Sequence, residues 1–231
     1  MRLVVEPMEL EDIPQVLEVD RESYSLPWPA SAYRREIVHN RNARYIVLRR
    51  IPDEGEEPVP ALEPGHRPRL PIPFFRWPQK AGETVERPGH IVGYAGMWLM
   101  VDEAHITTIA VRADWRGRGL GELLLASLIE EATALRAHRV TLEVRVSNDT
   151  AQRLYRKYGF HQEGVRARYY SDNSEDAYIM TTNSLQSSAY QTSFTSLVTS
   201  LQERLLANGD VSVAAPAFSA LQDAGAASEA D

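Results

Sequence analysis

The 231-residue sequence contains no cysteine. Without cysteine the chain can form no disulfide bond, no zinc or iron–sulfur site built on thiolates, and no thiol nucleophile. A cysteine-free chain suits the reducing conditions of the cytosol. We expect a protein that holds neither a metal ion nor a disulfide framework.

Long hydrophobic runs are also missing. The most apolar stretch, Leu120–Ile129, contains Glu122 and is followed by two more acids, so it falls short of the roughly 18 apolar residues that a membrane span needs. The N-terminal residues MRLVVEPMELED have neither the apolar segment nor the small-residue cleavage site of a secretory signal. We therefore predict a cytoplasmic protein with no membrane partner.

Basic charge is not in excess either, because the formal net charge is −7. Residues 51–90 hold nine of the 14 prolines with five bases and seven acids, and residues 184–231 hold one base and five acids. In the remainder of the chain, 19 Lys and Arg nearly balance 20 Asp and Glu. Nucleic-acid-binding proteins usually carry a basic excess, so no direct nucleic-acid partner is expected.

The same two segments define the predicted domain plan. Residues 1–183 are expected to form a single domain that carries a Pro-rich insert at 51–90, and residues 184–231 to form a C-terminal tail. Within the tail, the leucine spacing predicts a short helix over Thr195–Leu206. The Ala/Ser/Asp-rich residues beyond Asn208 are predicted to be disordered.

Strand and helix patterns alternate through the rest of the chain. Segments rich in β-branched and aromatic residues, or with period-two alternation, predict strands at Leu3–Glu6, Ala43–Leu48, His90–Met100, Ala104–Arg112, Arg139–Val146, Phe160–Tyr170 and Asp176–Thr181. Apolar residues at helical spacing, with start and stop signals, predict helices at Asp12–Ser23, Pro29–Asn40, Leu120–Arg136 and Asn148–Gly159. Strands and helices mixed around one sheet predict an α/β (α+β) layered fold.

The Pro-rich insert connects two of these strands. Ala43–Leu48 and His90–Met100 are expected to pair as a hairpin, and a long connection between them costs little free energy, roughly 0.6 kcal/mol for each doubling of its length. Phe74, Phe75 and Trp77 are interleaved with proline in the insert. They make the insert a candidate partner-docking or lid segment, and the alternative is a disordered or surface-packed loop.

A glycine- and arginine-rich turn, Arg116–Gly121, lies between a predicted buried strand and a predicted helix. Glycines allow the backbone to turn tightly, and the free N–H groups of the first helical turn attract anions. Three arginines, Arg112, Arg116 and Arg118, add positive charge. The spacing G-x-G-x-G fits neither the dinucleotide-binding motif nor the mononucleotide P-loop, and Glu143 lies in the middle of the next strand rather than at its end. A simple strand-to-helix connection is the alternative.

The sequence around this turn resembles the GNAT N-acetyltransferases. TTIAVRADWRGRGLGELLL, with R-x-x-G-x-G at Arg116–Gly121, and NDTAQRLYRKYGF at Asn148–Phe160 are similar to the acetyl-CoA motifs of that superfamily. LPW at Leu26–Trp28, VDEA at Val101–Ala104 and YYSDNSEDAYIM at Tyr169–Met180 are similar to the RimI-type subgroup, which acetylates protein N-termini, notably alanine on a small-subunit ribosomal protein. The resemblance covers most of residues 1–50 and 91–183, and the insert and the tail have no counterpart.

The resemblance implies a mixed, mostly antiparallel central sheet of about seven strands with helices on both faces. It also implies that the fourth and fifth strands splay apart to admit the pantetheine arm of acetyl-CoA, which pairs with backbone groups of Ile109–Val111. N–H groups of Gly117–Glu122 would hold the pyrophosphate, and Asn148 and Tyr155 would contact the rest of the coenzyme. From the residue pattern, Asn148 or Ser147 is also the expected cap of the following helix. The residues implied to bind the cosubstrate are Ile109, Ala110, Val111, Arg116, Gly117, Arg118, Gly119, Leu120, Gly121, Glu122, Asn148 and Tyr155.

The implied reaction moves an acetyl group to an amine without a metal. An N-terminal amine has a pKa of about 7.7–8.0 against about 10.4 for lysine, so a modest base is sufficient for it. The resemblance implies Glu103 as that base, and strand alternation places His105 on the same face, where it assists or replaces Glu103. The backbone N–H of Ile109 or Val111 would stabilise the oxyanion, and the Tyr155 phenol would protonate the thiolate.

The resemblance also implies the acceptor site. Leu26, Pro27 and Trp28 would line the pocket for the first side chain, and Tyr169 and Tyr170 would hydrogen-bond the peptide backbone; ordinary packing is the alternative for all five. The predicted function is acetyl-CoA-dependent N-α-acetylation of a protein N-terminus, such as a ribosomal protein that starts with Ala. The alternatives are an acetyltransferase for a lysine side chain or small amine, and a non-catalytic acyl-CoA-binding interaction module.

Overall fold

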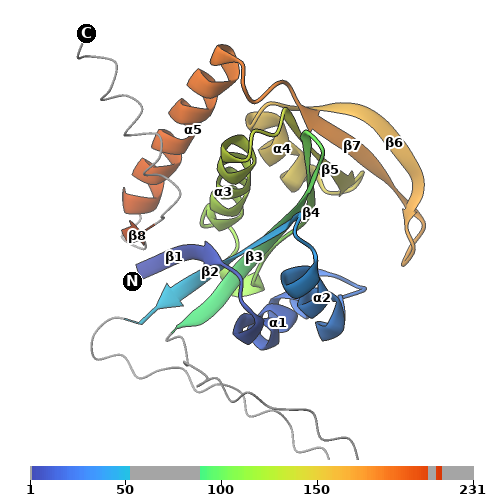
Figure 1. Cartoon of the computed structure of the whole chain (residues 1–231), viewed down its shortest axis with the longest axis vertical. Helices are drawn as coiled ribbons and strands as arrows, with labels where there is room; N and C mark the ends of the chain where they lie inside the picture. Colours follow the sequence, from blue (N-terminus) through green and yellow to red (C-terminus); the bar gives the residue numbers. More distant parts are fainter. Residues whose placement is uncertain (1, 53–88, 208–211, 215–231) are drawn as a thin grey trace, which may run out of the picture.

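The computed structural model describes residues 2–52, 89–207 and 212–214, which form one sheet with helices on both faces (Figure 1). The strands are β1 Arg2–Pro7, β2 Ala43–Ile51, β3 His90–Met100, β4 Glu103–Val111, β5 Arg139–Arg145, β6 Phe160–Tyr170, β7 Glu175–Thr182 and β8 Ser212–Ala214. The helices are α1 Ile13–Ser23, α2 Ala30–His39, α3 Leu120–Ala134, α4 Asp149–Lys157 and α5 Ser188–Ala207, with short 3₁₀ turns at Leu10–Asp12 and Ala113–Trp115.

The strand order in the sheet is β6-β7-β5-β4-β3-β2-β1-β8. Neighbouring strands are antiparallel except for two parallel pairs, β4 with β5 and β1 with β8. The predicted mixed, mostly antiparallel sheet is therefore confirmed. The short β8 joins the seven predicted strands as an eighth.

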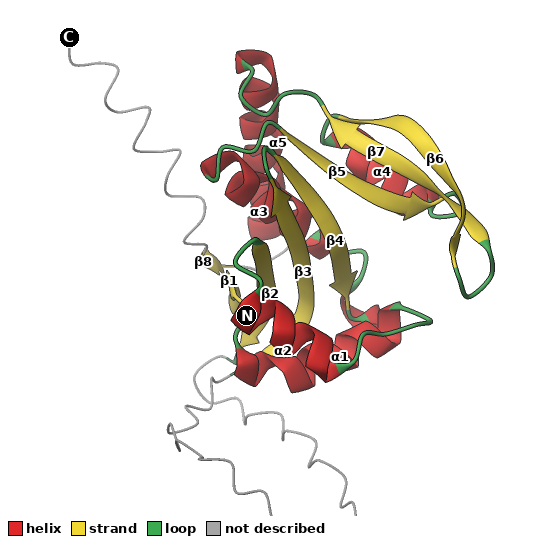
Figure 2. Cartoon of the chain, turned by 45° about the vertical axis from the view of Figure 1, so that its right-hand side comes forward, coloured by secondary structure: helices red, strands yellow, loops and turns green. Residues whose placement is uncertain are grey.

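Each face of the sheet buries its own hydrophobic cluster. On one face, α3 and α5 pack leucines and aromatics against β3, β4 and β5. On the other face, α1 and α2 cover residues of β2, β3 and β4 that include Tyr45, Tyr94 and Ala110. Figure 2 shows the β6–β7 hairpin reaching away from the part of the sheet that α1 and α2 cover, so the second half of the sheet is open on that side.

The C-terminal segment differs from its prediction. Helix α5 begins at Ser188 rather than at Thr195, and Phe194, Val198 and Leu201 are buried in the cluster under α3. These apolar residues recur at helical spacing, so α5 has a continuous stripe to bury. The folded unit therefore extends to Ala207, past the predicted boundary at residue 183. The predicted disorder beyond Asn208 falls outside the described residues, except at 212–214.

The predicted hairpin of the two strands that flank the insert is confirmed. β2 and β3 pair along their length, from Ala43 opposite Trp98 to Arg50 opposite His90. Residues 53–88, which include Phe74, Phe75 and Trp77, lie outside the described residues.

Candidate active site

The site forms where β4 and β5 stop pairing. Their parallel ladder joins Glu103–Ile106 to Arg139–Leu142 and ends there. On its other side β4 carries a bulge, because Gly96 pairs with Thr108 while the next residue of β3 pairs with Ile106, which leaves Thr107 unmatched. Bulges bend a strand, and Figure 2 shows β4 and β5 running apart beyond this point. The splay that the resemblance implies is present.

The backbone of β4 turns alternate residues toward this opening. Arg112 N–H donates to Val92 O of β3 at 2.9 Å, so in an antiparallel ladder the backbone groups of Val111 and Ile109 point the other way, toward β5. Two side chains confirm this orientation: Arg116 Nε donates to Val111 O at 2.9 Å, and the Tyr24 hydroxyl donates to Ile109 O at 3.0 Å. No strand pairs with this edge of β4 in the described residues, so its N–H groups suit an extended ligand chain.

Ala110, between these two residues, faces away from the opening. It lies opposite Tyr94 in the register of β3 and β4, so its backbone groups are directed into the sheet. Its side chain is buried in the cluster that α1 covers. Ala110 is therefore a packing residue between two residues that face the opening.

The turn before α3 has the geometry of an anion site. Gly117 and Gly119 adopt positive φ angles of 77° and 84°, which only glycine adopts readily. Gly119 is the N-cap of α3 and provides no side chain to accept from the first-turn N–H groups. These N–H groups, together with the positive end of the helix dipole, fit the pyrophosphate of acetyl-CoA.

Each of the three arginines around the turn contacts other groups of the protein. Arg116 connects β4 to α1, because its Nε bonds Val111 O and its Nη2 donates to Ser23 Oγ at 3.2 Å. Arg112 pairs with Glu18 and Glu22 of α1. The guanidinium of Arg118 lies over the Trp115 ring at 4.9 Å. Arg116 therefore braces the turn, and its predicted part in cosubstrate binding stays a prediction.

Glu122, in the first turn of α3, is neutralised by three donors. Its Oε1 accepts from Lys157 Nζ at 2.6 Å, from Arg204 Nη2 at 2.9 Å and from the Tyr158 hydroxyl at 2.9 Å. Burial raises the pKa of Glu122, but these hydrogen bonds and the two cations outweigh burial and lower it. Because Lys157 and Arg204 come from α4 and α5, the carboxylate ties both helices to the phosphate-binding turn.

The two predicted cosubstrate residues of α4 occupy different surroundings. Asn148 Oδ1 accepts from Ala151 N–H at 3.1 Å, which confirms its predicted role as helix cap. Tyr155 packs on the core with its ring 5.7 Å from that of Phe160. Burial, with smaller contributions from Tyr24 and Tyr170, raises the pKa of Tyr155 well above its ordinary value. The Tyr155 phenol therefore keeps its proton at neutral pH.

The opening contains a buried carboxylate that sequence reasoning missed. Glu143 follows the last paired residue of β5, and its side chain is only 6% exposed. Its Oε2 lies 2.8 Å from His105 Nε2 and its Oε1 lies 3.0 Å from Arg166 Nε. Burial raises the pKa of Glu143, but the His105 hydrogen bond and the charges of His105 and Arg166 outweigh burial and lower it. Glu143 is therefore an ionised carboxylate that lies between the His105 imidazole and the Arg166 guanidinium at the open edge.

Glu103, the predicted base, is at the other end of the ladder. It is the first residue of β4 and its Oε2 bonds Arg139 Nε at 2.6 Å. Glu143 is four residues further along β5 than Arg139, the partner of Glu103, which places it about 13 Å closer to the pantetheine segment. Glu103 therefore lies at the closed end of the strand pair, away from the opening, and its role as the base stays a prediction. His105 lies at the opening, as predicted.

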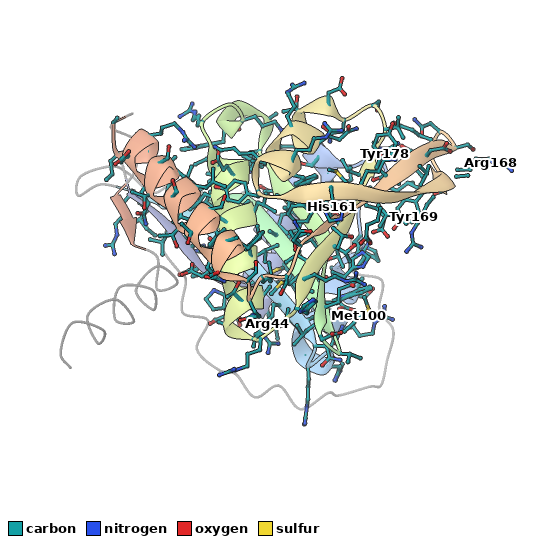
Figure 3. All side chains as sticks on the ribbon, turned by 90° about the horizontal axis from the view of Figure 1, so that it is seen from above. Arg44, Met100, His161, Arg168, Tyr169 and Tyr178 are labelled. Carbon is teal, nitrogen blue, oxygen red and sulfur yellow. The ribbon has the colours of Figure 1, made fainter. Side chains whose placement is uncertain are left out.

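The predicted acceptor residues lie on two facing segments. Leu26 and Trp28 in the α1–α2 loop are 63% and 37% exposed, and Pro27 between them is also exposed. On β6, the Tyr169 ring is 5.1 Å from that of Tyr170, and Figure 3 shows Tyr169 toward the outer end of the β6–β7 hairpin.

A hydrogen bond joins these two segments, because Ser25 of the α1–α2 loop donates to the Asp172 carboxylate in the β6–β7 turn. Arg145 of β5 binds the same carboxylate at 2.8 Å and lies over the Tyr170 ring at 3.8 Å. The structure therefore brings the predicted acceptor residues to two sides of one opening.

Of the two residues that the sequence analysis missed, Glu143 left a signal in the sequence and Tyr24 did not. In RVTLEVRV, alternation places Glu143 on the face opposite Val140, Leu142 and Val144, and a charged residue in the middle of a central strand is expensive to bury without a function or a partner. Tyr24 gave no such signal, because it ends a helix and reaches Ile109 only across the fold.

Among the described residues, no group of three or more His, Asp or Glu side chains is arranged to hold a metal ion. In the same part of the chain, no helix has the length and hydropathy that crossing a membrane requires.

Comparison with known proteins identifies the class of protein that this site defines. The sequence profile of the Acetyltransferase (GNAT) family matches residues 51–160. A relative from Bacillus subtilis is 35% identical over 179 residues, which cover 78% of this chain and 94% of the relative. The chain therefore belongs to the GNAT family of acetyltransferases and is an acetyl-transferring enzyme.

Two relatives carry names that state a more specific activity for those proteins. The Bacillus subtilis protein carries the provisional name of a ribosomal protein bS18-alanine N-acetyltransferase. The Escherichia coli protein named ribosomal protein bS18-alanine N-acetyltransferase is 25% identical over 178 residues, covering 76% of this chain and 94% of its own length.

Two solved structures share the fold. The crystal structure of the ribosomal-protein-S18-alanine N-acetyltransferase from Escherichia coli matches with a TM-score of 0.56 at 24% identity, covering 78% of this chain and 92% of that one. A chain of the NatC complex bound to Gag peptide and CoA matches with a TM-score of 0.56 at 19% identity, covering 79% and 99%.

Proposed function

We propose that this enzyme transfers the acetyl group of acetyl-CoA to the N-terminal α-amine of a protein, with a ribosomal protein that begins with alanine as its substrate. The named activities of its relatives from Bacillus subtilis and Escherichia coli support this acceptor. Such a substrate is made in the cytoplasm, which is the location we propose.

The observation that carries the proposal is the buried Glu143–His105 pair at the open edge of β4. An attacking amine must lose a proton, and a carboxylate that is ionised at neutral pH can accept it. An α-amine with a pKa of about 7.7–8.0 is already partly neutral near pH 7.5, so a carboxylate with a low pKa is an adequate base for it. A lysine side chain, with a pKa of about 10.4, is mostly protonated at the same pH and would need a stronger base than this carboxylate.

The other residues of the opening complete the chemistry. Val111 and Ile109 direct their backbone N–H groups into the splay, where a fixed donor stabilises an oxyanion without reorganising. Tyr155 retains its proton and is the acid we assign to the leaving thiolate. The N–H groups after Gly119 hold the pyrophosphate, so that the thioester end extends along β4 toward Glu143.

The test compares acceptors of different chemistry. The enzyme is incubated with acetyl-CoA and either a peptide that begins with Ala, the same peptide with a blocked N-terminus and an internal lysine, or a polyamine, and thiol release and peptide mass are measured. Acetylation of the free N-terminus alone supports the proposal. Acetylation of the blocked peptide or the polyamine would favour the side-chain or small-amine alternative, and tight cosubstrate binding without turnover would favour a binding module.

A further inference from the structure

Asp20 of α1 is a buried carboxylate that the mechanism above does not use. It is 2% exposed, yet both of its oxygens are hydrogen-bonded. Oδ2 accepts from Trp28 N–H at 2.7 Å, and Oδ1 accepts from the Tyr94 hydroxyl. Burying a charged carboxylate is costly unless donors satisfy it, and here the donors come from a surface loop and from the middle of the sheet.

The bond to Trp28 is the main backbone anchor of the acceptor loop. Trp28 lies between Pro27 and Pro29, neither of which has an N–H group, so it supplies the single backbone donor of this tripeptide. Leu26 is 63% exposed and packs little, so besides this bond the loop is held by Ser25, which donates to Asp172, and by the Trp28 ring, which lies 5.6 Å from that of Tyr33. The position of the loop therefore depends strongly on where Asp20 holds Trp28.

The bond to Tyr94 connects the same carboxylate to the open edge of β4. Since Tyr94 gives its proton to Asp20, its oxygen accepts from neighbours, including Thr108 Oγ1 at 3.2 Å. Thr108 is itself a residue of β4, and beside it the Tyr24 hydroxyl directs its proton to Ile109 O at 3.0 Å. A continuous chain of hydrogen bonds thus runs from the acceptor loop to the strand that faces the pantetheine arm.

We propose that Asp20 is a positioning residue that fixes the α1–α2 loop against the open edge of β4 and thereby sets the selectivity for the first residue of the acceptor. This proposal rests on the proposed function, because it concerns the acceptor side of that site. Asp20 touches neither substrate. It acts through Trp28, whose side chain the proposed function assigns to the acceptor pocket, and through Tyr94 and Thr108.

The test uses Asp20→Asn, which keeps the shape but has one acceptor oxygen, so Trp28 N–H or Tyr94 loses its partner. We expect the ratio of kcat/KM between Ala-starting and Met-starting peptides to fall about tenfold, because small displacements of a positioning group cost large factors in rate. We expect the Kd of acetyl-CoA, measured by calorimetry, to stay within about twofold, because the phosphate turn is unaffected.

Glu36→Gln is the matched control. Glu36 is also a buried carboxylate with two donors, Trp98 Nε1 at 2.8 Å and Asn40 Nδ2 at 2.7 Å, but neither donor leads to the acceptor loop. It should lose stability and keep its selectivity. Equal selectivity in Asp20→Asn and the wild type, with only a lower Tm, would overturn the proposal.

Hydrogen–deuterium exchange of residues 24–29 separates this proposal from the proposed function. Faster exchange in Asp20→Asn than in Glu36→Gln is expected whether or not any peptide is acetylated, and unchanged exchange would overturn the anchoring role. If the wild type acetylates no N-terminus, the proposed function fails while this readout stands. If Asp20→Asn does not fold, Tyr94→Phe replaces it, with an expected threefold loss of selectivity, roughly, and no loss as the contradicting result.

Discussion

The two ends of the β4–β5 ladder carry the same type of residue in opposite surroundings. At the closed end, the Glu103 side chain is 24% exposed and pairs with Arg139, which is 46% exposed. At the open end, Glu143 is 6% exposed between His105 and Arg166. Both glutamates reach toward the same side of the sheet, and only one of them lies where a ligand can approach β4.

The difference shows that strand register, rather than residue type or face, sets the burial and the partners of each acid. An exposed ion pair is screened by water and contributes little beyond solubility. A buried carboxylate has no water to replace its partners, so the neighbours control its charge and its position. The predictions that follow test this contrast between the two ends of the ladder.

Glu143→Gln should give the largest effect. Loss of the base is expected to lower kcat/KM for an N-terminal peptide about 100-fold or more, while the acetyl-CoA Kd stays within about twofold. The matched variant Glu103→Gln should keep activity within about twofold, because the described partner of Glu103 is Arg139, at the closed end. Thiol release measures both variants, and equal losses in the two would remove the distinction between the ends.

A third glutamate extends the comparison to a buried acid without partners. Glu130 of α3 is 8% exposed, and within the described residues neither of its oxygens has a hydrogen-bond partner. Burial, with a smaller contribution from the Glu131 charge, raises the pKa of Glu130 to about 7. The folded state therefore holds this proton more tightly than the unfolded state, and the free energy of unfolding falls as pH rises from about 4.5 to about 7.

Glu130→Gln removes that penalty. We expect the free energy of unfolding to rise by about 2 kcal/mol at pH 8, equivalent to about 30-fold in the folding equilibrium, and to change much less at pH 4.5. Urea unfolding at the two pH values measures the difference. Glu131→Gln is the control, because Glu131 is half-exposed and pairs with Arg44 at 3.5 Å. Its charge makes only the smaller contribution to the raised pKa of Glu130, so its pH-dependent gain should be much smaller. A destabilised Glu130→Gln at pH 8 would contradict the assignment.

Tyr155→Phe tests the acid at the open end. If the phenol protonates the leaving thiolate, its loss should lower kcat about tenfold with little change in KM for the peptide. Tyr190→Phe is the control. Burial also raises the pKa of Tyr190, but this residue belongs to α5 and its hydroxyl donates to Tyr158 O. Steady-state kinetics of both variants decide the matter, and a fully active Tyr155→Phe would assign the thiolate proton to another group.

Local pattern predicted most of the fold. Alternation and helical spacing placed seven strands and four helices, since these periods follow directly from backbone geometry. The early start of α5 was missed because Ser188–Gln191 has no apolar stripe of its own, and its helix is stabilised by the packing of Phe194 and later residues on α3.

The site was predicted less completely, for a physical reason. Gly117, Gly119 and Asn148 have backbone roles that their own residue types dictate, so sequence alone located them. The choice between Glu103 and Glu143 depends on where the parallel ladder of β4 and β5 ends, and these two strands are separated in sequence by α3. Period-two alternation gives the face of a residue but not its position along the opening.

Substitution of two arginines is expected to give the smallest difference between the two ends of the ladder. Arg139 and Arg166 are similarly exposed, at 46% and 52%. Arg139 pairs with Glu103 at 2.6 Å and more distantly with Glu163 at 3.6 Å, and Arg166 pairs with Glu143 at 3.0 Å. If bond length governed function, Arg139→Gln would matter more. We expect the reverse: Arg166→Gln should lower kcat/KM about threefold, because it raises the pKa of the buried Glu143 and frees its carboxylate, while Arg139→Gln leaves activity unchanged. Rates measured from pH 5.5 to 8 should show the Arg166→Gln deficit growing toward acid pH, and a deficit independent of pH would mean that Arg166 acts on the peptide rather than on Glu143.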